Sequence, residues 1–259
     1  MTGFVELMIY GTGVVDWEFL LLCAISFLGS LITASIGIGG GTLMLATMAL
    51  LMPPAVLVPI HGVVQLGSNF GRALLLYREI IREIIPIFLI GTIIGVILGG
   101  QVVIALPVEI LQVILSIFIL YTVWVPTLKA LAVKKFSFLG IGVVGAFTTM
   151  FVGATGPLIT PFVIAISIGR KQVVATHACL MTIQHTFKLI VFGFLGFGFF
   201  PYIPLIISLI IFGFIGTYIG KLALNRIPEN IFRVTLKLVL TIMALKLFFT
   251  AISYWFSAA

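Results

Sequence analysis

Charged side chains are scarce in this sequence of 259 residues: Lys, Arg, Asp and Glu together make up 8%, and only 7 residues are acidic, whereas 62% are hydrophobic. A soluble globule needs far more polar surface to face water, so the composition excludes that class. Apolar runs long enough to cross a bilayer recur from Trp17 onward, with short connections between them. The sequence therefore predicts an all-α polytopic membrane protein without a soluble domain.

Cysteine is also rare, with two residues in the chain. Both Cys23 and Cys179 lie inside apolar runs, where we expect free thiols that pack as small hydrophobic side chains. No Lys or Arg precedes Trp17, so residues 1–16 lack the basic start of a cleaved signal peptide. We expect these residues to form an N-terminal tail or a short helix on the extracytoplasmic side.

Motifs for catalysis and for nucleic acid are missing as well. The three histidines do not have the spacing of metal ligands, and no Gly-x-Ser-x-Gly nucleophile elbow occurs. The formal net charge of +7 comes from basic residues at the ends of apolar runs, not from an aromatic-rich basic patch. The sequence therefore predicts no enzyme, no metal or cofactor site, and no nucleic-acid partner.

Glycine, in contrast, is abundant, with 27 residues, and the stretch from Gly37 to Gly41 interrupts an apolar run. Glycine lets a helix stop, turn and restart, which leaves backbone N–H groups free at the new N-terminus. A second break, Gly-Ala-Thr-Gly-Pro at residues 153–157, follows at a spacing of 116 residues. At this spacing the matched positions are Gly29 with Gly145, Gly37 with Gly153, Gly40 with Gly156, Gly41 with Pro157, His61 with His177, Asn69 with His185, and Arg72 with Lys188.

These matches predict an internal duplication, because two of the three histidines would rarely fall at a preset spacing by accident. After an insertion of five residues the correspondence resumes, with Gly95, Gly99 and Pro107 falling on Gly216, Gly220 and Pro228. We therefore divide the chain into a tail (1–16), a first transmembrane repeat (17–128), a cytoplasmic linker (129–136) and a second transmembrane repeat (137–256).

The charge distribution predicts how the two repeats are oriented. Each break leads into an apolar segment, 42–52 or 158–168, that covers about 16 Å as a helix, half of a bilayer crossing. If each broken segment crossed the membrane once, the basic loop residues would divide evenly between the two sides, against the positive-inside rule. If each returns to its own side as a helical hairpin or re-entrant pair, these residues share one face: Arg78, Arg82, Lys129, Lys134, Lys135, Arg170, Lys171, Lys221, Arg226 and Arg233.

The second arrangement gives two inverted structural repeats, each starting with a glycine-broken helical hairpin or re-entrant pair. Both termini would lie outside and the basic loops in the cytoplasm. Many secondary transporters follow this plan and place their substrate site where the two repeats meet.

Polar side chains at helical spacing mark where such a site would lie. His61, Gln65, Asn69 and Arg72 share one face of an otherwise apolar helix, and the second half offers a comparable stripe of His177, Gln184, His185 and Lys188. Polar groups at membrane depth generally face protein or a water-filled cavity, so they indicate a pathway. The alternatives are hydrogen bonding between helices and, for Arg72 and Lys188, snorkelling to an interface.

The sign of the charges decides which ligand we expect. No Asp or Glu lies in the middle of any apolar run, so the membrane interior offers donors and cations without carboxylates. Such a lining favours an anion, and two half-helix N-termini would add positive dipole ends. The glycines alone could instead serve close helix packing. The predicted substrate-binding residues are Gly39, Gly40, Gly41, Thr42, His61, Gln65, Asn69, Thr155, Gly156, His177, Gln184 and His185, with Arg72 and Lys188 attracting or gating the anion at opposite mouths.

These residues carry a resemblance to a known family. The glycine-rich break at 37–41 with Pro53, and its looser counterpart at 153–157 with Pro161, are similar to the paired motifs of the sulfite exporter TauE/SafE family of membrane permeases. The resemblance covers about residues 17–256. It implies transport of small sulfur-containing anions, such as sulfite or sulfonates, across the cytoplasmic membrane.

Three functions stay open at this stage. The first is a secondary transporter for a small anion, and because histidine titrates near neutral pH, exchange or symport of protons is a hypothesis that accompanies it. The second is a passive anion channel on the same frame. The third is a non-transporting membrane scaffold subunit in which the polar stripes only join helices. The expected partners are a small anion and membrane lipid.

Overall fold

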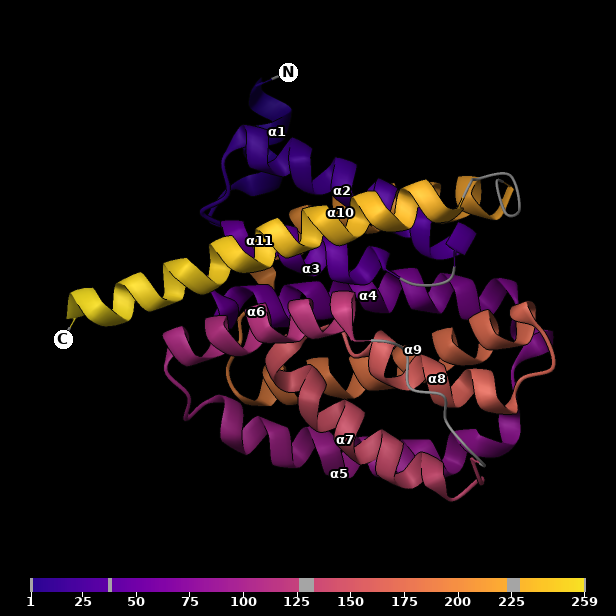
Figure 1. Ribbon diagram of the computed structural model, residues 1–259. Coiled ribbons are helices and arrows are strands. Elements are labelled where there is room, and N and C mark those ends of the chain that lie inside the picture. The colour runs from indigo at the N-terminus through magenta and orange to yellow at the C-terminus, as the bar shows by residue number, and fades with distance from the viewer. Residues whose placement is uncertain (1, 37–38, 126–132, 223–228, 259) are drawn as a thin grey trace.

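The computed structural model describes residues 2–36, 39–125, 133–222 and 229–258, and the helices there form a bundle (Figure 1). In chain order the α-helices are α1 (Thr2–Ile9), α2 (Asp16–Ile36), α3 (Gly40–Leu51), α4 (Pro54–Leu75), α5 (Ile85–Val103), α6 (Val108–Trp124), α7 (Ser137–Val152), α8 (Gly156–Ile166), α9 (Arg170–Phe194), α10 (Ile203–Leu222) and α11 (Glu229–Ala258). Short 3₁₀ turns lie at Tyr77–Glu79, Arg82–Ile84 and Phe200–Tyr202. No strand occurs in the described residues.

The outside of the bundle is apolar. Among the described residues, four helical segments are long and apolar enough to cross a membrane: Asp16–Ser35, Arg82–Val103, Phe200–Gly220 and Val234–Ser253. Large hydrophobic side chains on them face outward, for example Ile97 on α5 and Phe214 on α10. Surfaces of this kind are stable against lipid, and the protein is an all-α membrane protein, as its composition predicts.

Helices α4 and α9 are long, yet they are less apolar than the four candidate spans because they carry the two polar stripes. Figure 1 shows both helices in the middle of the bundle, between a layer containing α2, α10 and α11 and a layer of α5 and α7. The two helices pack against each other in opposite directions, since Gly62 of α4 lies beside Leu189 near the end of α9 while both helices meet again at the cavity described below. Their polar faces are therefore turned inward, away from lipid.

The first glycine break reverses the chain. In a continuous helix Gly29 and Gly40 would be about 16 Å apart, but a Cβ placed on Gly29 would lie 2.8 Å from the Gly40 carbonyl oxygen. Gly39 has φ +105°, a conformation that side chains rarely adopt. Residues 37 and 38 of the break lie outside the described residues. Helices α2 and α3 therefore form a hairpin, which is one of the two forms predicted from the sequence.

The second break has the same form. Gly153 has φ +80° and ends α7, and a Cβ placed on Gly145 would lie 3.0 Å from Cδ1 of Ile159 in α8. A straight helix would separate residues 145 and 159 by about 21 Å. The half-helices begin two residues earlier than predicted, at Gly40 and Gly156. Helix α3 ends at Leu51, one residue before the predicted end of its segment, and Pro54 is the first residue of α4.

Close helix pairs cross between the two halves of the chain. Helix α5 packs along α7, and α10 packs along α2, so each early helix of one half pairs with a later helix of the other. In the duplicated sequence α2 corresponds to α7, and α5 corresponds to α10. The α2–α10 pair is therefore equivalent to the α7–α5 pair with the two halves exchanged. The inverted orientation of the halves in the membrane, and the repeat boundaries at 17–128 and 137–256, stay predictions.

We expect Gly95→Ala to destabilise the protein, because the α5–α7 pair depends on small residues. A Cβ on Gly95 would lie 2.8 Å from Cβ of Ala146 and 2.9 Å from the Phe147 backbone nitrogen. Overpacking of this kind typically costs about 1–3 kcal/mol. Gly140→Ala on α7 is the matched control, since nothing lies within 4 Å of a Cβ there, and it should leave thermal unfolding in detergent unchanged or slightly raised. Equal melting temperatures for the two variants would contradict this packing.

Candidate functional site

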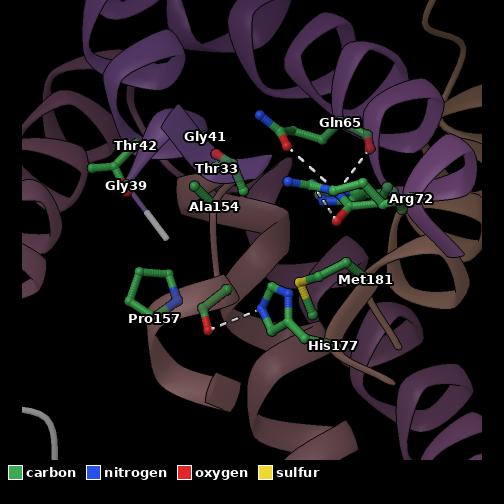
Figure 2. A pocket seen from close by; sticks show the side chains of 13 residues that line it. Thr33, Gly39, Gly41, Thr42, Gln65, Arg72, Ala154, Pro157, His177 and Met181 are labelled. Carbon is green, nitrogen blue, oxygen red and sulfur yellow. Dashed lines mark hydrogen bonds between the residues drawn. The ribbon is translucent and has the colours of Figure 1, made fainter. Parts of the chain in front are cut away.

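One cavity brings the two helix breaks together (Figure 2). Its volume is about 50 Å³, enough for a few water-sized groups or one small ion. The lining residues come from α2, from both broken segments and from α4 and α9: Thr33, Gly39, Gly41, Thr42, Gln65, Asn69, Arg72, Ala154, Gly156, Pro157, His177, Met181 and His185. The cavity therefore lies between elements of both halves of the chain.

The first break contributes backbone donors. Helix α3 begins at Gly40, its N-cap residue Gly39 has no side chain to cap it, and the first intrahelical bond runs from the Leu43 N–H to the Gly39 carbonyl at 3.0 Å. The N–H groups that precede Leu43 have no acceptor within the helix, and the positive end of the helix dipole adds to their attraction for an anion. Gly41 and Thr42 are at the cavity, so a bound anion can accept from this end.

The second break contributes fewer donors. The Thr155 hydroxyl is used elsewhere, since it donates to Oε1 of Gln184 at 2.9 Å, and Pro157 in the first turn has no N–H. Ala154, Gly156 and Pro157 nevertheless line the cavity. The two breaks therefore face the same space with unequal donor capacity, which matches the looser form of the second motif.

Arg72 supplies the positive charge of the cavity. Its guanidinium Nη2 donates to Oδ1 of Asn69 at 2.8 Å, and Asn69 Nδ2 donates to the Gln65 carbonyl at 2.8 Å (Figure 2). The side chain is 6% exposed, and its Nε has no hydrogen-bond partner among the described residues. A buried guanidinium held by a neutral amide retains donors and charge for a ligand, and Arg is well suited to bind two oxygens of one anion.

Two histidines of α9 also line the cavity. His177 Nε2 lies 3.3 Å from the Gly156 carbonyl oxygen, and because a carbonyl only accepts, Nε2 carries the proton and donates (Figure 2). His185 is buried, and its Nδ1 has no partner within the described parts of the chain. Neither Asp nor Glu is among the lining residues, and the described residues contain no group of three or more His, Cys, Asp or Glu side chains that could hold a metal ion.

The structure gathers most of the predicted substrate-binding residues at the cavity: Gly39, Gly41, Thr42, Gln65, Asn69, Gly156, His177 and His185. Four others lie behind the wall. Gly40 packs on the α2 backbone, His61 donates through Nε2 to the Gly41 carbonyl at 3.1 Å, and Thr155 and Gln184 bond to each other. Of the two cations, Arg72 lines the cavity and Lys188 does not.

Three cavity residues, Thr33, Ala154 and Met181, were not predicted from the sequence, and Pro157 was predicted only as part of the second break. The repeat contains a signal for one of them. At the spacing of 116 residues Met181 falls on Gln65, a predicted site residue, so the corresponding face of α9 includes Met181. Thr33 falls on Thr149, which does not line the cavity, so the repeat gives no signal for Thr33.

A polytopic helical protein with a cationic internal cavity between two broken helices has the architecture of a membrane transporter. The chain matches the family described as Sulfite exporter TauE/SafE over residues 21–247, and the protein belongs to this family. The resemblance noted in the sequence is thereby confirmed. Comparisons with curated proteins and with solved structures gave no match.

Proposed function

We propose that the protein is a secondary transporter that moves a small sulfur-containing anion, sulfite or an organosulfonate, across the cytoplasmic membrane. The observation that carries the proposal is the cavity, in which Arg72 and the N-terminus of α3 face the same space. The family match over residues 21–247 supports the substrate class. The absence of Asp and Glu from the lining disfavours a cation as the substrate.

The lining fits the chemistry of a sulfur oxyanion. Such an anion has several oxygens around one centre and loses its hydration when it enters a closed space, so each oxygen needs a donor. Arg72 offers guanidinium N–H groups, the start of α3 offers backbone N–H groups, and Thr42 lines the same cavity. A cavity of about 50 Å³ is large enough for a small oxyanion.

Alternating access would follow from the predicted inverted repeats. In that arrangement the cavity lies where the halves meet, and rocking one half against the other opens it to one side of the membrane at a time. The hairpins and the cross-paired helices α2–α10 and α5–α7 support this proposal. The basic loops would then face the cytoplasm.

Transport can be tested directly with purified protein in proteoliposomes. We expect saturable uptake of sulfite or a sulfonate and accumulation against its gradient when a proton gradient is imposed. Flux that follows only the electrochemical gradient of the anion would indicate a channel instead. Absence of flux for sulfite, thiosulfate and sulfonates, from vesicles containing folded protein, would contradict the proposed function.

His177→Gln is expected to uncouple anion transport from protons. Glutamine keeps a donor for the Gly156 carbonyl but cannot take up a proton, whereas an imidazole ring can. His185 and Arg72 line the same cavity and remain in place. Downhill anion exchange should persist, while accumulation driven by a proton gradient should be lost and the pH dependence of flux should flatten. Coupling through His177 is excluded if the variant accumulates anion as the original protein does.

A further inference from the structure

Lys188 of α9 is a buried cation outside the cavity. Its side chain is fully buried, with 0% exposure, and Nζ has no hydrogen-bond partner among the described residues. An amine in this position does not snorkel to an interface, and it does not join two helices by a hydrogen bond. Buried amines without a partner are unfavourable in a protein interior, so the position calls for a ligand or a functional explanation.

Two glycines make room for the Lys188 amine. A Cβ on Gly62 of α4 would lie 3.4 Å from Nζ, and a Cβ on Gly153 would lie 3.7 Å from it. His61 borders the same space, since its Nδ1 would be 3.1 Å from the Gly153 Cβ. That nitrogen is also buried without a hydrogen-bond partner in the described part of the chain. Lys188 Nζ is a donor, and His61 Nδ1, on a ring that already donates through Nε2, becomes a donor when the ring takes up a proton, so both nitrogens can then contact one anion.

This cluster corresponds, through the repeat, to the cationic wall of the cavity. At the spacing of 116 residues Lys188 falls on Arg72 and His61 falls on His177. In the cavity Arg72 of the first half lies with His177 of the second half. Beside Gly153 the halves are exchanged, and Lys188 of the second half lies with His61 of the first. His185 is one helical turn before Lys188 and lines the cavity, so it lies between the two clusters.

We propose that Lys188 and His61 form a second position for the transported anion, which becomes accessible when the Arg72 cavity closes. This inference rests on the proposed function and specifies its path: the anion moves from Arg72 past His185 to Lys188. At both positions the anion would contact a basic side chain and a histidine that lie beside one of the helix breaks. In an inverted-repeat transporter the two halves exchange conformations between the outward-open and inward-open states, and the two anion positions would exchange roles in the same way.

The test separates binding from transport in Lys188→Met and Arg72→Met. Methionine has a similar length and removes the unpartnered amine, so Lys188→Met should fold with an unchanged or higher melting temperature. We expect sulfite binding to Lys188→Met within about threefold of the original protein, but sulfite exchange in proteoliposomes reduced at least about tenfold. Unreduced exchange in Lys188→Met would overturn the second position, and so would a loss of binding equal to that of Arg72→Met.

Gly62→Ala provides an independent variant that leaves Lys188 in place. Its methyl group would lie 3.2 Å from Cε of Lys188 and fill part of the space beside the amine. Gly71→Ala on the same helix is the matched control, because its Cβ would make only an ordinary contact of 3.6 Å with Phe214. Exchange should fall in Gly62→Ala and not in Gly71→Ala, and equal exchange in both would overturn the proposal. Retained binding in Arg72→Met would instead contradict the proposed function itself.

Discussion

Arg72→Met is expected to weaken binding of sulfite or a sulfonate by about 30-fold or more. Removing one partner of a buried charge pair costs about 2–5 kcal/mol, and each 1.4 kcal/mol is a factor of ten. Arg72 is the cation among the cavity-lining residues, it is 6% exposed, and its Nε is unused by the described residues. Because the side chain is buried, water cannot readily take its place as a hydrogen-bond donor to the anion. Equilibrium binding to the purified protein measures the effect.

Arg78→Met is the matched control for this experiment. Arg78 is exposed in the turn that follows α4, where its Nε donates to the Tyr77 hydroxyl. Losing that charge should leave the affinity for anions close to that of the original protein, because exposed charges are screened by water and salt. If Arg72→Met and Arg78→Met bound the anion equally well, Arg72 would have no direct part in recognition.

Gly41→Leu is expected to abolish anion binding in a protein that still folds. A Cβ on Gly41 would lie 3.0 Å from Nε2 of Gln65, the end of a flexible side chain that can move aside. The rest of the leucine would then occupy a cavity of about 50 Å³ and cover the first turn of α3. We expect a loss of at least about 100-fold in affinity, with an elution profile in size-exclusion chromatography like that of the original protein.

Variants of two other glycines serve as controls for Gly41→Leu. Gly140→Leu adds the same side chain where nothing lies within 4 Å of a Cβ, and it should bind the anion normally. Gly40→Ala should instead lose the fold, because its Cβ would meet the Gly29 backbone and force the α2–α3 hairpin apart. Normal binding by Gly41→Leu would return the glycine stretch to a packing role only.

Much of the fold could be predicted because its signals are local or periodic. Apolar run lengths indicate the membrane class, and Pro54 marks the start of α4. The hairpins could be predicted because a straight crossing would have divided the basic residues evenly. Helix ends are harder to predict: the apolar run that contains α9 continues to Phe199, but the helix ends at Phe194. Gly196 adopts φ +88° there, and the Phe197 N–H turns back to the Phe192 carbonyl.

The site was predicted by residue type more fully than by position. Polar side chains at helical spacing identified Gln65, Asn69, His177 and His185, all at the cavity. Helical periodicity predicts which face of a helix a residue lies on, but not where along that face the cavity lies. For that reason His61 and Lys188, which share those faces, lie behind the cavity and not in its lining. Gly40 differs for another reason, since its lack of a side chain serves the close approach of α2.

The central claim is that two helix breaks and Arg72 together bind one small sulfur oxyanion. Thermal unfolding of the purified protein with sulfite, thiosulfate, sulfonates and other small anions tests it most directly. A ligand at 100 times its Kd stabilises the folded state by about 2.7 kcal/mol, so a bound anion raises the melting temperature by several degrees. We predict such a shift with sulfite or a sulfonate, and its loss in Arg72→Met. A melting temperature that no anion of the panel changes would contradict the claim.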